Sequence, residues 1–212
     1  MAIRRWTAFG RRRFAILLIV LLGVPLGTAS LASDGVQDAQ AFIVGLADQA
    51  IAALTPPGIS RGERETRARV LLNDNFAVPT IGQFVLGRYW RTATPEERKE
   101  YLALFEELIV VTYVDRFSRY SGERLKVTRT VSDNDSGDTI VYSEISRPAG
   151  QPIEVGWRVR KYASAFKIVD VYVEGVSMGQ TQRSEFSSVI RNNGGSLTAL
   201  LDEMRRRVRQ ET

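Results

Sequence analysis

The chain has 212 residues, of which 29 are basic and 24 acidic, and it contains neither cysteine nor histidine. Without these two residue types there is no disulfide framework, no Ser-His-Asp or Cys-His catalysis, and hardly any zinc or copper site. Most enzyme classes are thereby excluded, so we expect no catalytic residues, no metal and no other cofactor.

The first 32 residues have the composition of a cleaved secretory signal peptide. Residues 1–13 hold five arginines and no acid, an apolar run follows from Phe14 to Leu22, and small residues lead to Ala32. The run is well short of the ~20 residues that span a bilayer. We expect cleavage after Ala32, by the general or the twin-arginine route, with a retained anchor as the alternative. Residues 33–212 are then one periplasmic domain.

Removal of residues 1–32 changes the charge of the protein. The segment carries five basic residues and no acid, so residues 33–212 have 24 of each sign and no net charge. A nucleic-acid-binding protein keeps a basic excess in its folded part. Binding to nucleic acid is therefore not expected. The basic excess of the full chain comes entirely from the predicted export signal.

Helices are predicted for the first half of the mature chain. Apolar residues at 3.6-residue spacing predict an amphipathic helix over 36–54. Ser60 and Glu63 form a predicted capping box for a second helix, which runs to about Asn73. A short helix is expected over 79–87, with Pro79 in its first turn.

A longer helix follows, because Thr94, Pro95 and Glu97 combine an N-cap, a proline at the first helical position and a capping glutamate. We expect this helix to end near Gly122. One of its faces carries aromatic and aliphatic residues, namely Tyr101, Phe105, Leu108, Thr112 and Tyr113.

The periodicity then changes from 3.6 to two. Four strands are predicted, over about 125–131, 139–147, 153–159 and 166–174. Alternation is strictest in the third, where Val155, Trp157 and Val159 alternate with polar residues or glycine. Since short polar turns connect the strands, the sheet should be antiparallel with one buried face.

Two further helices close the chain. One is expected over about 180–192 and ends at Asn193-Gly194. Ser196 caps the last, whose apolar stripe is Leu197, Leu200, Leu201, Met204 and Val208. The fold class predicted is α+β, with N-terminal helices, a four-stranded curved antiparallel sheet and C-terminal helices that enclose an apolar cavity.

The acidic segment from Asp133 to Asp138 has a composition like that of a calcium-binding loop. Its glycine, however, stands at the fifth position of the loop where an EF-hand has it at the sixth, and strands rather than helices flank the segment. A polar hairpin turn accounts for the same residues. We therefore predict a turn and no metal.

Three segments together resemble a known family: FVLGRYWRTATPEERKEYLALFEELI at 84–109, VDVYVEGVSMGQTQRSEF at 169–186, and NGGSLTALLDEMR at 193–205. In this order, after a signal peptide, they resemble the MlaC family, also called the toluene-tolerance family, of periplasmic phospholipid-binding proteins. The resemblance covers residues 36–209.

This resemblance implies a carrier rather than an enzyme. It implies that acyl tails lie between sheet and helices, and that the protein shuttles phospholipid between an outer-membrane lipoprotein complex and an inner-membrane ABC lipid transporter, maintaining outer-membrane lipid asymmetry. The protein is expected to be a monomer. From the parity of the third strand and the face of the long helix, we predict the lipid-binding residues to be Phe105, Ile109, Tyr113, Val155, Trp157 and Val159.

Three alternatives remain at this point. The cargo can be another lipid, such as a hopanoid. A small α+β enzyme can use Asp115 or Asp170 on a hydrophobic substrate, which requires a buried carboxylate with a raised pKa. A pure adaptor protein has a dry core and no cavity. Arg183 is expected to pair or cap locally.

Overall fold

The computed structural model describes residues 30–148, 150–163 and 165–211. Residues 1–29, which hold most of the predicted signal peptide, lie outside the described part. The predicted cleavage therefore stays a prediction. Within the described part, no helix combines the length and the apolar character needed to cross a bilayer.

From residue 30 onward, five helices precede the sheet: α1 (Ser30–Leu54), α2 (Arg61–Asn75), α3 (Val78–Leu86), α4 (Tyr89–Thr92) and α5 (Pro95–Ser118). The Thr94 hydroxyl accepts from the Glu97 amide and the Glu97 carboxylate accepts from the Thr94 amide, which confirms the predicted capping box. The box predicted for α2 is only half formed. Ser60 accepts from the Glu63 amide, but the Glu63 carboxylate binds Arg67 instead.

Helix α5 departs from the prediction at its end and along its face. It ends at Ser118, four residues before Gly122, and the Ser118 hydroxyl donates to the Asp115 carbonyl. The next residue, Arg119, has left the helical conformation, with a φ of −104° and a ψ of 14°. The predicted face is also only partly buried, because Thr112 and Tyr113 are exposed. The buried residues of the helix are Tyr101, Phe105, Val110, Val111 and Val114.

The sheet is an antiparallel meander in the order β1-β2-β3-β4-β5. Its strands are β1 (Leu125–Asp133), β2 (Asp138–Ile145), β3 (Ile153–Tyr162), β4 (Ala165–Val173) and β5 (Val176–Ser177). The four predicted strands are present, and the fifth was missed because two residues carry no periodicity. The predicted α+β class is confirmed, with five strands in place of four.

Register places alternate residues of β3 on one face of the sheet, here called the inner face. Val155, Trp157 and Val159 pair across β2 with Ser143, Val141 and Thr139. The opposite, outer face carries polar and aromatic contacts: the Arg129 guanidinium lies 3.7 Å above the Tyr142 ring, and Arg158 donates to the Tyr172 hydroxyl at 3.1 Å. One buried and one solvated face is the expected pattern for an antiparallel sheet.

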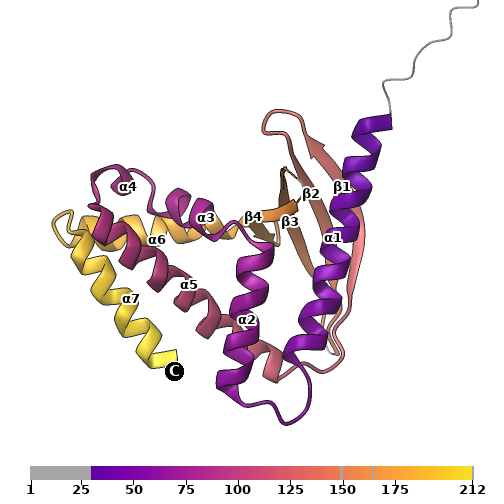
Figure 1. The fold of residues 1–212 in the computed structure, drawn as a ribbon, viewed down its shortest axis with the longest axis horizontal. Helices are drawn as coiled ribbons and strands as arrows, with labels where there is room; N and C mark the ends of the chain where they lie inside the picture. The colour runs from indigo at the N-terminus through magenta and orange to yellow at the C-terminus, as the bar shows by residue number, and fades with distance from the viewer. Residues whose placement is uncertain (1–29, 149, 164, 212) are drawn as a thin grey trace, which may run out of the picture.

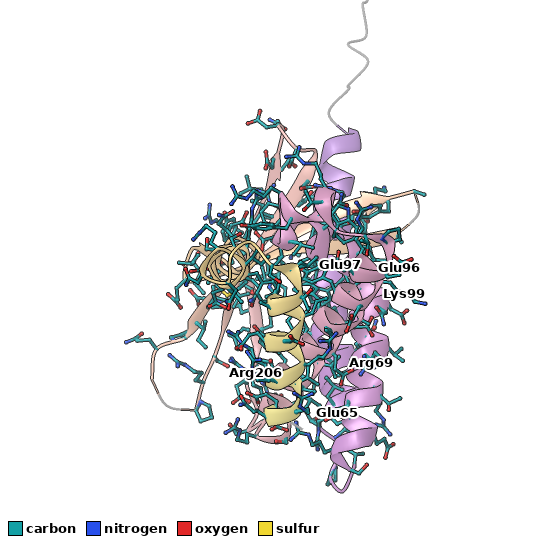
Figure 2. All side chains as sticks on the ribbon, turned by 90° about the vertical axis from the view of Figure 1, so that its left-hand side faces the viewer. Glu65, Arg69, Glu96, Glu97, Lys99 and Arg206 are labelled. Carbon is teal, nitrogen blue, oxygen red and sulfur yellow. The ribbon has the colours of Figure 1, made fainter. Side chains whose placement is uncertain are left out.

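Two helices follow the sheet, α6 (Met178–Asn192) and α7 (Leu197–Glu211). The predicted stripe of α7 is confirmed, since Leu200, Leu201 and Met204 are buried. In Figure 1, α1 runs along the sheet, whereas α2, α5, α6 and α7 form a separate helical layer. Figure 2 looks onto that layer, where exposed charged side chains such as Arg206, Glu96 and Lys99 cover its outside.

Candidate functional site

Most of the buried apolar residues in the described part of the chain fall into two clusters. The helical cluster joins α2, α3, α5, α6 and α7 and consists of Leu72, Val78, Val85, Leu86, Tyr101, Phe105, Val110, Phe186, Ile190, Leu200, Leu201 and Met204. The sheet cluster joins α1 to the inner face and consists of Ala39, Ile43, Val141, Val159 and Ile168. A domain of this size usually has one contiguous core. The boundary between the two clusters is therefore the candidate site.

The two clusters meet where α2 ends. Phe76 directly follows α2 and packs against both clusters. Its backbone forms a bridge with Ile168 of β4, and the next amide, of Ala77, donates to the Ile168 carbonyl at 2.9 Å. Sequence reasoning missed Phe76, because a single aromatic residue after a helix belongs to no periodic pattern.

The helices contact the sheet in two separate regions. Helix α1 packs on β1 and β2, whereas α2, α3 and α6 contact β4. The central strand β3 lies between these two contact regions. Trp157, in the middle of β3, is partly buried and faces inward beside Val141 and Val171. This part of the inner face, between α1 and the helical layer, is the candidate wall for an apolar ligand.

The polar groups of this wall are satisfied within the protein. The Trp157 indole Nε1 donates to the Ser143 hydroxyl at 3.0 Å, and that hydroxyl donates to the Val155 carbonyl at 3.2 Å. Among the described residues, every buried side-chain nitrogen or oxygen has a hydrogen-bond partner. The described part of the wall consequently offers apolar surface without an unpaired buried polar side-chain atom, which suits acyl chains.

The three sheet residues predicted to bind lipid share the inner face, as their alternation required. Val155 is 5% exposed, Val159 is 1% exposed in the sheet cluster, and Trp157 packs against that cluster. The residues that accompany them from α1 include Phe42, whose ring lies 5.9 Å from that of Phe166.

The three helix residues lie in different surroundings. Phe105 stacks on Tyr101, with ring centroids 5.8 Å apart, and meets Phe186 edge to face at 6.4 Å. Ile109 is partly buried against the helical cluster. Tyr113 is 45% exposed, with the Arg116 guanidinium 5.0 Å above its ring. Of the six predicted residues, two therefore lie in or against each cluster, Val155 is buried outside both, and Tyr113 is exposed. Their joint role in lipid binding stays a prediction.

Carboxylates that were candidates for chemistry have structural partners. Asp170 accepts from the Ser177 hydroxyl at 2.6 Å and from the Gly179 amide at 3.0 Å, and so it fixes the start of α6. Asp115 lies 3.4 Å from Arg61. Both carboxylates are thus engaged by donors within the protein.

The acidic loop is a hairpin turn, as predicted. Asp133 pairs with Asp138 across the turn, and Gly137 has a φ of 72°. Both carboxylates bind arginine: Asp138 contacts Arg160 at 2.7 Å and Arg158 at 3.4 Å, while Asp133 contacts Arg158 at 2.9 Å. Burial opposes the ionisation of Asp138, yet the two guanidinium groups hold its pKa below the ordinary value.

The motifs that suggested a family meet in space around Phe84. The Arg183 guanidinium lies 5.1 Å above the Phe84 ring, and a Cβ added to Gly87 would lie only 3.0 Å from Arg183 Nε. A Cβ on Gly179 would meet the same ring at 3.4 Å. Arg183 was expected to pair or cap, but it stacks on an aromatic ring instead. These contacts hold α3 against α6.

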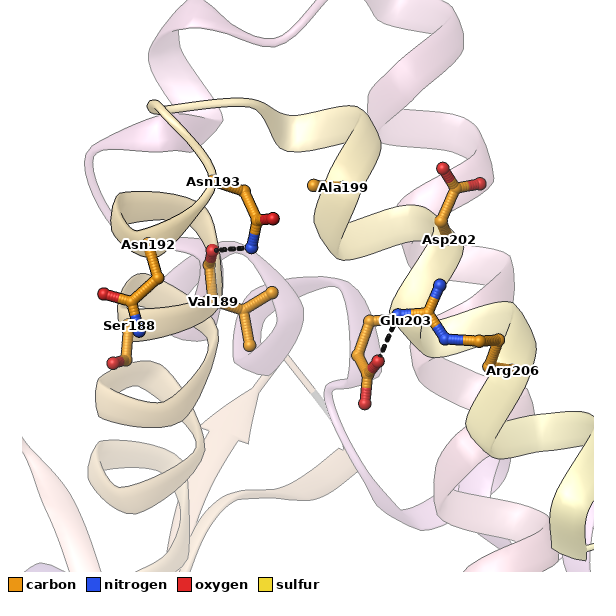
Figure 3. A pocket seen from close by; sticks show the side chains of 8 residues that line it. All are labelled: Ser188, Val189, Asn192, Asn193, Ala199, Asp202, Glu203 and Arg206. Atoms are coloured by element: carbon orange, nitrogen blue, oxygen red, sulfur yellow. Dashed lines mark hydrogen bonds and ion pairs between the residues drawn. The ribbon is translucent and has the colours of Figure 1, made fainter.

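A groove between α6 and α7 has a different character. Its lining is polar and includes Asn192, Asn193, Asp202, Glu203 and Arg206. Figure 3 shows Asn193 donating to the Val189 carbonyl at the end of α6, and Arg206 paired with Glu203 on α7, one pair on each side of the groove. Such a lining is poorly suited to acyl chains, because their burial would desolvate charged groups.

Comparison with known proteins gives consistent matches. A family model described as MlaC protein matches residues 46–206. The toluene tolerance protein ttg2D of Pseudomonas putida is 23% identical over 115 residues, which are 54% of this chain and 53% of that protein. The intermembrane phospholipid transport system binding protein MlaC of Haemophilus influenzae is 24% identical over 116 residues, 53% of this chain and 54% of that protein. The chain thus spans about half the length of the curated relatives it matches.

A solved structure has the same fold. It is a phospholipid-binding protein from Ralstonia solanacearum in complex with a phospholipid, and it superposes with a TM-score of 0.71 at 24% sequence identity. The match covers 82% of this chain and 98% of that chain. At this identity the likeness establishes the arrangement of helices and strands.

Proposed function

The chain belongs to the MlaC family, and from this membership we propose that it is a periplasmic carrier that holds a phospholipid between its sheet cluster and its helical cluster. The lipid enters from one membrane-bound partner and leaves to another. These partners are an outer-membrane lipoprotein complex and an inner-membrane ABC lipid transporter. The carrier maintains the lipid asymmetry of the outer membrane and performs no reaction on its cargo.

The observation that carries the proposal is the division of the apolar core. Trp157 and its neighbours on the inner face belong to one cluster, Phe105 and Ile109 of α5 to the other, and Phe76 joins the two. Acyl chains between the clusters would complete one continuous apolar interior. The absence of unpaired buried polar atoms among the described residues supports an apolar cargo.

The energetics require a carrier of this kind. Two acyl chains contain about 30 methylenes, and each is worth ~0.8 kcal/mol when removed from water. Transfer through free water would therefore cost about 24 kcal/mol. A carrier whose walls match the apolar interior of the bilayer makes the exchange nearly neutral, so the lipid can move in either direction as partners dictate.

Export places the carrier where this exchange occurs. We infer that residues 1–32 are removed as a signal peptide and that residues 33–212 form the mature domain. The basic start, short apolar run and small-residue exit of this segment support the inference.

The experiment is lipid extraction combined with a charge placed on the proposed wall. Organic extracts of the purified protein should contain phospholipid by mass spectrometry, and Trp157→Arg should greatly reduce its amount. The control is Val131→Arg, which adds the same charge on β1 at a side chain that is 43% exposed on the outer face. This control should retain its lipid.

Stability distinguishes a lipid cavity from a dry core. If acyl chains cover Trp157, water can replace them around the new guanidinium, and Trp157→Arg should fold at a modest cost. A packed, dry interior would have to bury the charge at several kcal/mol and the variant would unfold. Wild-type protein that yields no lipid, together with an unfolded Trp157→Arg variant, would refute the carrier. A hopanoid in the extract would correct the cargo alone.

A further inference from the structure

A second pocket lies at the α4 end of the helical layer, away from the boundary between the two clusters. It is lined by Arg88, Tyr89, Arg91, Thr92, Arg191 and Gly195. The three arginines come from two parts of the chain, the α4 turn and the last turn of α6. The lining contains no acidic residue, although the mature chain as a whole has no net charge.

Local backbone geometry brings these arginines together. Gly87 ends α3 with a φ of 60°, and the chain then turns directly into α4. After α6, Gly194 and Gly195 also have positive φ, and the Gly195 amide donates to the Ile190 carbonyl at 2.9 Å. Glycine is the residue that adopts such a backbone without strain. The two turns therefore place Arg88 and Arg91 beside Arg191, and Gly195 adds no side chain to the pocket.

These arginines differ from others of the helical layer in lacking acidic partners. Arg69 binds Glu106 and Glu107, and Arg205 binds Glu100 and Asp202. Within the described residues, by contrast, no ion pair involves any of the three arginines of the pocket. Arg88 is oriented by the Tyr89 side chain, since its Nη2 donates to the phenol oxygen at 2.9 Å and its guanidinium lies 4.9 Å from the ring centre.

Three arginines around one pocket, without an acidic partner among the described residues, favour a particular kind of ligand. Each presents a planar fork of donors that matches two oxygens of an oxyanion. A carboxylate is satisfied by a single fork, whereas a phosphate group offers more oxygens in a tetrahedral arrangement and suits several arginines approaching from different sides. We propose that this pocket binds a phosphate group, presented either by a soluble phosphate or by the headgroup of an anionic lipid in a membrane surface.

The test uses two triple variants that change the charge equally. The first is Arg88→Gln/Arg91→Gln/Arg191→Gln, in which all three positions are exposed and folding should persist. The control is Arg119→Gln/Arg124→Gln/Lys126→Gln, whose exposed residues follow the opposite end of α5. Thermal melting should show both variants folded, and the single variant Arg91→Gln provides the same readout should the first triple fail to fold.

Two probes distinguish the source of the phosphate. Inorganic phosphate is titrated calorimetrically at low ionic strength, with chloride as the comparison anion. Vesicles of phosphatidylcholine, with and without phosphatidylglycerol, are tested by co-sedimentation. We expect binding by wild type and control, and binding at least about tenfold weaker in the pocket triple, because charge-assisted hydrogen bonds are lost.

Each outcome has a defined meaning. Arginine-dependent binding to phosphatidylglycerol vesicles assigns the site to a lipid headgroup, and binding to inorganic phosphate alone assigns it to a soluble ligand. No binding in either assay, or equal loss in both triple variants, overturns the proposal. The site is independent of the proposed cargo, so the pocket triple should still yield extractable phospholipid. Loss of that lipid would contradict the separation of the two sites.

Discussion

The pairing of Asp138 with Arg160 allows a quantitative test of the structure. The Asp138 side chain is 1% exposed and accepts from Arg160 at 2.7 and 2.9 Å, while Arg158 lies 3.4 Å away. Replacement by Asn keeps the size of the side chain and removes its charge. A hydrogen bond to a charged group is worth about 1.5–3 kcal/mol, but Arg160 is 40% exposed and water can replace part of the loss. We therefore expect Asp138→Asn to lower the free energy of unfolding by about 1–2 kcal/mol at pH 7.

The effect should depend on pH in a defined direction. Because the folded-state pKa of Asp138 lies below the unfolded value, its contribution is present above the unfolded pKa and is lost as pH falls through the folded pKa. An ordinary aspartate has a pKa of about 3.9. The stability difference between wild type and Asp138→Asn should accordingly be full at pH 7 and shrink below about pH 4.

The assay is urea denaturation of wild type, Asp138→Asn, Arg160→Gln and the double variant. The double-mutant cycle should give a coupling energy of about 1 kcal/mol at pH 7 and a smaller one in acid. Calcium or a chelator should leave the unfolding midpoint unchanged, since the Asp133 and Asp138 carboxylates are already paired with arginines. Zero coupling at pH 7, or an Asp138→Asn cost that is the same at pH 3, would refute the assigned ion pair.

Two further outcomes can be checked directly. Gly87→Ala should destabilise the protein by about 1–3 kcal/mol. The reason is that Gly87 has a φ of 60° and that an added Cβ would lie 3.0 Å from the Arg183 guanidinium. Gly62→Ala, in open space on α2, is the matched control and should be neutral or stabilising in thermal melts. N-terminal sequencing of the exported protein should begin close to Ser33, and an intact Met1 on membrane-anchored protein would contradict the periplasmic assignment.

Local features of the fold could be predicted from the sequence. The hydrogen bonds of the Thr94 capping box, the apolar stripe of α7 and the inward alternation of Val155, Trp157 and Val159 involve residues a few positions apart. Their geometry is determined by the period of a helix or strand, which the sequence displays directly. The polar turn after Asp133 could be predicted for the same reason, because it too involves residues close together in the sequence.

Other features depend on contacts between distant segments. The sequence indicated one aromatic and aliphatic face for α5, but both α7 and α2 pack on this helix, and its buried residues do not coincide with that face. Phe76 joins the two clusters through Ile168, which lies 92 positions further along the chain. No local pattern indicates such a contact.

The candidate sites also contain residues that local sequence patterns predict and residues that only tertiary packing brings together. Strand parity identified the inward residues of β3, whereas the helix residues opposite them were chosen without knowledge of how α5 packs. The pocket of Arg88, Arg91 and Arg191 forms only because two turns about 100 residues apart bring their side chains together. The sequence determines which face each element can bury, since hydrophobic periodicity is local. Tertiary structure decides what that face meets, because packing and charge pairing are set by the positions of all elements at once.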